Sequence, residues 1–195
     1  MGLVIHSLEN LPTSAKRNYF IYLLDYGWEE PIGKTLRKNF DKMANLAAKN
    51  KAVIVKGTEL GHFSNEVFSW HRINGLDAKD LLPGLLITNK HPNFFRDSAD
   101  DLKKRNSILL SSESDDLKLI LIPFKKFCKN ETEAIALIEK VFEDIIEQKD
   151  LVDFTISKDV KKGIGGAIFD SLILEPNFNG FGFSFKKFIE YFKTG

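Results

Sequence analysis

Apolar residues in the first quarter of the chain are arranged in a pattern that predicts a buried strand followed by an amphipathic helix. Residues 19–27 (YFIYLLDYG) form a nearly continuous apolar run, which is typical of a strand covered on both faces. Farther on, apolar side chains recur every three or four residues, the spacing of one helical face: Ile32, Leu36, Phe40, Met43 and Ala47. We therefore expect a strand over 19–26 and a helix over 31–49.

The same pattern continues beyond this unit. Three short apolar runs predict further strands, at residues 52–55, 82–88 and 117–123. A second helix is expected within 59–75, with Ser64 as a candidate N-cap, and a third over 131–148, capped by Asn130 or Thr132. The resulting order, β-α-β-α-β-β-α, predicts an α/β domain whose central mixed sheet of four to five strands is flanked by helices.

The two ends of the chain fall outside this alternation. Residues 1–18 are expected to form an N-terminal arm, or a short strand around Leu3–His6, ahead of a domain over 19–149. Residues 150–195 are expected to be an extension packed on that domain, with a possible strand at Val152–Ile156. The extension is rich in aromatic residues: Phe169, Phe178, Phe181, Phe183, Phe185, Phe188, Tyr191 and Phe192. These rings either extend the core of the domain or form a docking surface for a partner or a second copy.

Composition narrows the classes of function. The 195 residues contain 28 Lys and Arg against 27 Asp and Glu, so nucleic acid is not expected as a partner, since such binders usually carry a strong basic excess. Apolar runs are shorter than the roughly 20 residues of a membrane span, and the N-terminus does not read as a secretory signal. The single cysteine, Cys128, cannot form an internal disulfide, which fits a cytoplasmic protein.

Two local motifs resemble those of the thioredoxin-like superfamily. Residues 28–34 (WEEPIGK) are similar to the signature Trp-Cys-x-Pro-Cys-x-Lys, with Glu29 and Ile32 at the two cysteine positions. Residues 82–87 (LPGLLI) look like the family segment Ile-Pro-Thr-Leu-Leu-Leu, whose proline follows a cis peptide bond, so Pro83 is the candidate cis-proline. The resemblance covers roughly residues 19–149 and implies a thioredoxin-like fold, in which the first and second of the predicted strands are parallel and the third and fourth are antiparallel.

The resemblance also implies what the domain does and does not do. Thiol–disulfide exchange needs a thiolate nucleophile, which is absent from the signature, so the domain is expected to be redox-inactive. Family members that have lost their cysteines commonly keep the groove beside the cis-proline as a site for a peptide or protein partner. By this resemblance the binding residues are Trp28, Glu29, Pro31, Leu82 and Pro83. The carboxylates of Glu29 and Glu30 favour a basic partner, and no cofactor is expected.

Two other classes of function stay open. Asp25 and Tyr26 end the first strand and, with Glu29 and Glu30, can form a polar cluster where ligands bind open α/β sheets. An enzyme could use these carboxylates in acid–base catalysis, or an external thiol ligand, although a solvated rim is the simpler interpretation. Alternatively, the aromatic extension makes the chain a subunit of a homo-oligomer or a larger complex.

Metal and phosphate sites are not expected. Glu59, His62 and His71 lie in one segment and His91 follows the third strand, but the histidine spacing is not the i, i+4 of a helical zinc pair. Residues 162–166 (KGIGG) lack the spacing of a phosphate-binding loop, so a glycine turn is expected there.

Cys128 is the remaining candidate nucleophile. It follows the strand at 117–123, and the nearby lysines could favour its thiolate: Lys125, Lys126 and Lys129. An inert structural thiol is the expected outcome at such a position.

Overall fold

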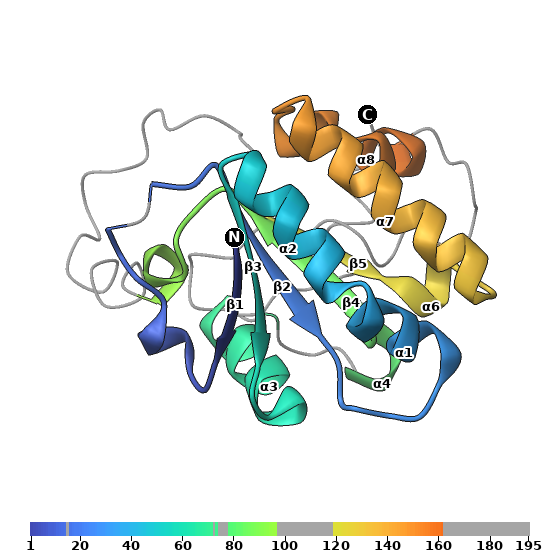
Figure 1. The fold of residues 1–195 in the computed structure, drawn as a ribbon, viewed down its shortest axis with the longest axis horizontal. Coiled ribbons are helices and arrows are strands. Elements are labelled where there is room, and N and C mark those ends of the chain that lie inside the picture. Colours follow the sequence, from blue (N-terminus) through green and yellow to red (C-terminus); the bar gives the residue numbers. More distant parts are fainter. Residues whose placement is uncertain (15, 72, 74–77, 97–118, 162–195) are drawn as a thin grey trace, which may run out of the picture.

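The computed structural model describes residues 1–161 except for 15, 72, 74–77 and 97–118. The glycine turn expected at 162–166 and the aromatic segment from Phe169 to Phe192 lie outside the described residues. Within the described part, the chain folds around a five-stranded mixed sheet with helices on both faces (Figure 1).

The sheet has the strand order β1-β3-β2-β4-β5. β1, β3 and β2 are parallel, whereas β4 is antiparallel to both β2 and β5. The strands are β1 Gly2–Ile5, β2 Tyr19–Leu24, β3 Ala52–Gly57, β4 Gly84–Thr88 and β5 Leu119–Pro123. The predicted α/β class and mixed sheet are confirmed, and the four strands expected from the apolar runs are present with shifted ends.

β2 is the central strand and contributes to two separate cores. Its side chains alternate between the faces of the sheet. Ile21 packs into the core under α1 (Pro31–Lys38), α2 (Phe40–Lys49) and α7 (Glu131–Ile146), and Tyr22 packs into the core under α3 (Leu60–Trp70). Both side chains have an exposed fraction of 0%. Coverage of both faces explains why the β2 sequence is an unbroken apolar run rather than an alternating one.

The N-terminal residues form a short strand, the alternative to an N-terminal arm. Leu3 pairs with Val55 of β3 in parallel register, and the amino group of Met1 donates to the carbonyl of Ala52 at 2.9 Å. Residues 2–5 therefore belong to the sheet rather than to a separate arm.

The helix expected over residues 31–49 is two helices, α1 (Pro31–Lys38) and α2 (Phe40–Lys49). Asn39 separates them with φ −87° and ψ 3°, and its side-chain amide donates to the carbonyl of Thr35 at 2.9 Å. Asparagine side chains compete with helical hydrogen bonding in this way, which accounts for the break. The predicted apolar face survives it, because both helices contribute buried residues to the same core.

The second predicted helix is α3 (Leu60–Trp70). Ser64 is inside this helix instead of at its N-cap, so that expectation was wrong. Its hydroxyl oxygen accepts a hydrogen bond from the Asp25 N–H at 3.0 Å and lies 2.9 Å from the carbonyl oxygens of Asp25 and Leu60. The serine therefore ties the end of β2 to α3.

The third predicted helix is α7 (Glu131–Ile146), and its expected cap is confirmed. The side chain of Asn130 accepts a hydrogen bond from the Glu133 N–H at 2.9 Å. α7 lies beside α1 and α2 over one face of the sheet (Figure 1). The shorter elements are η1 Leu8–Asn10, α4 Ala78–Leu81 and α6 Phe124–Phe127.

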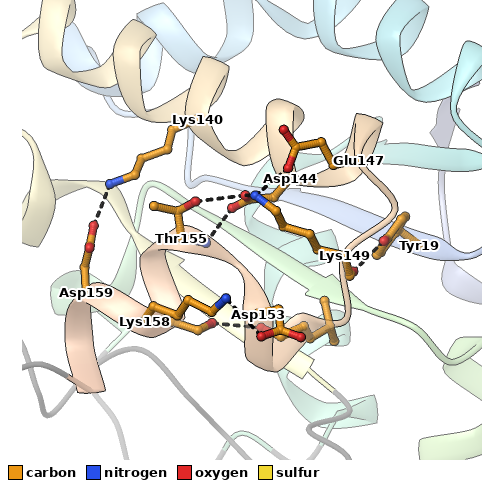
Figure 2. Close-up of polar contacts among 11 residues, drawn as sticks. Tyr19, Lys140, Asp144, Glu147, Lys149, Asp153, Thr155, Lys158 and Asp159 are labelled. Carbon is orange, nitrogen blue, oxygen red and sulfur yellow. Dashed lines mark hydrogen bonds and ion pairs between the residues drawn. The ribbon is translucent and has the colours of Figure 1, made fainter.

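The strand considered for residues 152–156 is absent, and these residues form η2 (Leu151–Asp153) and the start of α8 (Thr155–Lys161). The carboxylate of Asp144 in α7 accepts from the Thr155 N–H at 2.7 Å and the Thr155 hydroxyl at 2.9 Å (Figure 2). This carboxylate satisfies the backbone N–H and the hydroxyl of the first residue of α8, so a helix begins there.

Candidate functional site

Three parallel strands end at the same edge of the sheet, and the turn after the central one is the candidate site. We call residues 25–31, between the end of β2 and the first residue of α1, the β2–α1 corner. Pro31 occupies the first position of α1, where its missing N–H costs no hydrogen bond. Gly27 has φ +78°, a conformation that a residue with a side chain rarely adopts, and this lets the chain turn out of the sheet.

Asp25 is buried beneath the corner, with an exposed fraction of 0%. One carboxylate oxygen pairs with the guanidinium of Arg37, and the other accepts from the Gly27 N–H at 2.9 Å. Arg37 also donates to the carbonyl of Trp28 at 3.2 Å. Asp25 thus holds the corner together, and its oxygens are occupied by structural partners rather than directed at solvent.

Trp28 is the large apolar side chain that the corner exposes, with an exposed fraction of 36%. The ring of Tyr26 meets it edge-on, with centroids 5.3 Å apart, and Tyr26 in turn donates to the amide oxygen of Asn65 at 2.6 Å. The ammonium nitrogen of Lys125 in α6 lies 4.7 Å from the Trp28 ring centroid. The indole is therefore exposed yet held in place by two neighbouring side chains.

The two glutamates of the corner are both in ion pairs. Glu29 pairs with Lys34 at 2.5 Å, and this hydrogen bond lowers the pKa of the Glu29 carboxyl below its usual range. Glu30 pairs with Lys125 at 2.9 Å. The expectation that these carboxylates attract a basic partner loses its basis, because a lysine of the chain already faces each of them.

The two remaining predicted residues, Leu82 and Pro83, are joined by a cis peptide bond, and both are buried. The carbonyl of Pro83 accepts from the Phe124 N–H at 2.9 Å, at the start of the short helix that carries Lys125. The structure thus brings the predicted residues to one region, because α6 contacts Pro83 through Phe124 and Trp28 through Lys125. Three are exposed, namely Trp28, Glu29 and Pro31, whereas Leu82 and Pro83 lie beneath.

Sequence reasoning missed Lys125 and Arg37 as members of this site. Lys125 comes 97 positions after Trp28 in the sequence, and it belongs to an ordinary Lys-Lys doublet. Arg37 belongs to the solvated face of the predicted helix. Neither carries a local signal, because their positions depend on how α6 and α1 pack against the end of β2.

Cys128 is not a reactive thiol. Its side chain is 3% exposed. Burial raises the pKa of the Cys128 thiol to about 12, and the nearby Glu133 carboxylate adds to the shift. The thiolate is thus disfavoured, even though lysines flank the residue in the sequence.

The histidines considered as metal ligands are spread through the fold. His71 is buried against Tyr22 and Phe95, whereas His91 meets the ring of Phe20 edge-on. His62 lies beside His6, a partner that the sequence did not indicate. Residues 1–161, in the parts described, contain no group of three or more His, Cys, Asp or Glu side chains suited to a metal ion.

Comparisons with protein-family models, with curated proteins and with solved structures find no match for this chain. Among the helices that the structure describes, none is long and apolar enough to cross a membrane.

Proposed function

We propose that this chain is a redox-inactive, thioredoxin-like domain that binds a protein or peptide partner through the β2–α1 corner. Strand pairing supports the fold assignment: β2 and β3 are parallel, β4 and β5 are antiparallel, and the Leu82–Pro83 segment directly precedes β4. These are the pairings that the thioredoxin resemblance implies. The proposed location is the cytoplasm, on the strength of the single cysteine.

The exposed and braced Trp28 ring is the observation that carries the binding proposal. Tryptophan is enriched among the residues that dominate binding energy at protein interfaces. Because Tyr26 and Lys125 already restrict this ring, a partner that packs on it loses little additional side-chain entropy. The ion pairs around the indole form a polar rim, the arrangement that surrounds apolar contacts in many interfaces.

The accessible chemistry of the corner indicates the kind of partner. Each described carboxylate of the corner faces a cation of the same chain, so net charge attraction contributes little. An apolar or aromatic side chain of the partner, stacked on the indole, is the contact that fits. Leu82 and Pro83 contribute by supporting α6 from below and not by direct contact, since both are buried.

A peptide library displayed on phage tests this proposal. The full chain is panned, and enriched peptides are then measured against Trp28→Ala and against Trp70→Ala. Trp70 is the matched control, because it is the other tryptophan and its ring stacks with Arg96 instead of lying in the corner. We expect the Trp28 change to abolish binding and the Trp70 change to leave it intact. Peptides that bind the Trp28 variant with unchanged affinity would overturn the proposed site.

A further inference from the structure

Two exposed histidines from distant parts of the chain lie side by side at the edge where the parallel strands end. His6 directly follows β1, and His62 is in the first turn of α3. Their ring centroids are 5.7 Å apart and the ring planes differ by 21°. Both side chains are solvent-exposed, so neither ring is placed by burial in the core.

A carboxylate one turn further along α3 holds the segment that carries His6 against this helix. Glu66 accepts a hydrogen bond from the Ser7 hydroxyl at 2.6 Å and another from the Leu8 N–H at 2.9 Å. Those two residues directly follow His6, and Glu66 is four positions after His62. The same helix face therefore carries one histidine and clamps the segment that carries the other.

The ring of His6 has a second constraint. Its Nδ1 lies 3.4 Å from the hydroxyl oxygen of Thr58, directly after β3. A hydrogen bond at one imidazole nitrogen sets the orientation of the ring and presents the other nitrogen as a ligand, as in many metal sites of proteins. Because Nδ1 faces Thr58, Nε2 is the nitrogen of His6 that would bind a ligand.

We propose that His6 and His62 together bind one divalent transition-metal ion of the class Cu²⁺, Ni²⁺ and Zn²⁺, with Glu66 as the positioning residue. Imidazole nitrogens suit these ions, whereas Mg²⁺ and Ca²⁺ require oxygen ligands. With metal–nitrogen bonds of about 2.0–2.1 Å, two imidazoles that are adjacent ligands of one ion hold their centroids roughly 4.5–5.2 Å apart. The observed separation of 5.7 Å is slightly longer, so the rings must move together when the ion binds.

Small side-chain movements complete the site. The terminal torsion of histidine is broad, so each exposed ring can turn a nitrogen toward the shared ion without backbone movement. Water occupies the other coordination positions, because the described residues contain no third ligand of the cluster. A site of two neutral imidazoles follows the general order of affinity, with Cu²⁺ bound most tightly.

Calorimetric titration of Ni²⁺ into the untagged full chain tests the proposal. We expect one ion per chain, with binding weakened by about tenfold or more in His6→Ala and in His62→Ala, and roughly tenfold in Glu66→Ala. His91→Ala is the matched control and should bind as the unmodified chain does, since its ring contacts Phe20 and not another histidine. Circular dichroism confirms that each variant is folded.

A spectroscopic signature separates a shared ion from loose surface binding. Electron paramagnetic resonance of the Cu²⁺-loaded chain should report two coupled imidazole nitrogens, and only one in His62→Ala. Equal Ni²⁺ affinity in the unmodified chain and both histidine variants would overturn the proposal. A single coupled nitrogen in the unmodified chain would do the same.

Discussion

The ammonium group of Lys125 lies over the indole ring of Trp28, 4.7 Å from its centroid, and the same group pairs with Glu30 at 2.9 Å. One lysine thereby connects α6, at the end of β5, to the turn after β2. The contact fixes the exposed indole in one orientation and couples two parts of the chain that form the proposed binding surface.

Removal of this lysine should release the indole at a small cost in stability. In a Trp70→Phe background, where Trp28 is the only tryptophan, we expect Lys125→Ala to change the emission and lower the fluorescence anisotropy of Trp28. The loss in stability should be about 0.5–1 kcal/mol, because the contact is partly exposed. Lys126→Ala is the matched control, since this neighbour is exposed in the same helix. Identical anisotropy in both variants would contradict the proposed bracing.

Loss of the Arg37 guanidinium, beneath the corner, should reduce stability much more than loss of Lys125. Arg37→Ala leaves the fully buried Asp25 carboxylate without its charged partner. We expect the free energy of unfolding to fall by about 2–4 kcal/mol, at the lower side of the range for buried pairs because Arg37 is itself partly exposed. Urea denaturation measures the change.

Two further variants make this test specific. Lys38→Ala alters an exposed cation of the same helix and should change stability by less than about 0.5 kcal/mol. The double variant Asp25→Asn, Arg37→Met should recover part of the loss, since no buried charge is left unpaired. If Arg37→Ala proved as mild as Lys38→Ala, the structural role assigned to the pair would be wrong.

The carboxylate of Asp144 should be required for α8 to dock. It accepts two hydrogen bonds from Thr155 and pairs with Lys149 at 2.6 Å (Figure 2). We expect Asp144→Ala to destabilise the chain by about 2–3 kcal/mol, through the lost helix cap and the unsatisfied donors. Glu147→Ala removes an exposed carboxylate that pairs with the same lysine, and should cost much less. Hydrogen exchange at residues 155–159 should rise only in the Asp144 variant.

His71 should make the stability of the chain depend on pH in the mildly acidic range. Burial lowers the pKa of His71 from 6.5 to about 4, although the hydrogen bond to the Val67 carbonyl opposes the shift. The unfolded chain therefore binds the proton more readily. The stability due to neutral His71 is fully present above pH 6.5 and is lost as the pH falls toward 4. The loss amounts to about 3 kcal/mol.

Denaturant titrations between pH 7 and pH 4 measure this loss. His71→Leu, which cannot be protonated, should show a shallower decline across that window than the unmodified chain. Parallel pH profiles for the unmodified chain and His71→Leu would show that His71 does not titrate as its burial requires.

The chain should lack disulfide reductase activity, because Glu29 and Ile32 stand at the cysteine positions of the signature and Cys128 is buried with a raised pKa. An insulin-reduction assay should give the background rate. Cys128 should react with a thiol reagent only after urea is added. Reductase turnover that disappears in Cys128→Ser would show that this thiol acts as a nucleophile after all.

The sequence by itself determined the features that depend on neighbouring residues. The unbroken apolar run of β2 predicted a strand covered on both faces, and Asn130 predicted the start of α7, because strand burial and helix capping leave local patterns. The sequence pattern did not predict the break at Asn39, which depends on a hydrogen bond of the Asn39 side-chain amide. It also did not predict the helix that replaces the expected strand at 152–156, because that helix depends on the Asp144 carboxylate from another element.

The tertiary structure decided which distant residues meet. Lys125 lies over Trp28, and Arg37 pairs with Asp25 beneath the corner. His6 lies beside His62 because the parallel strands end at one edge of the sheet. The sequence also did not show that Leu82 and Pro83 lie beneath the exposed surface of the corner, since this position results from packing around α6. Such contacts depend on long-range strand pairing and helix packing, which a local pattern of residue types does not encode.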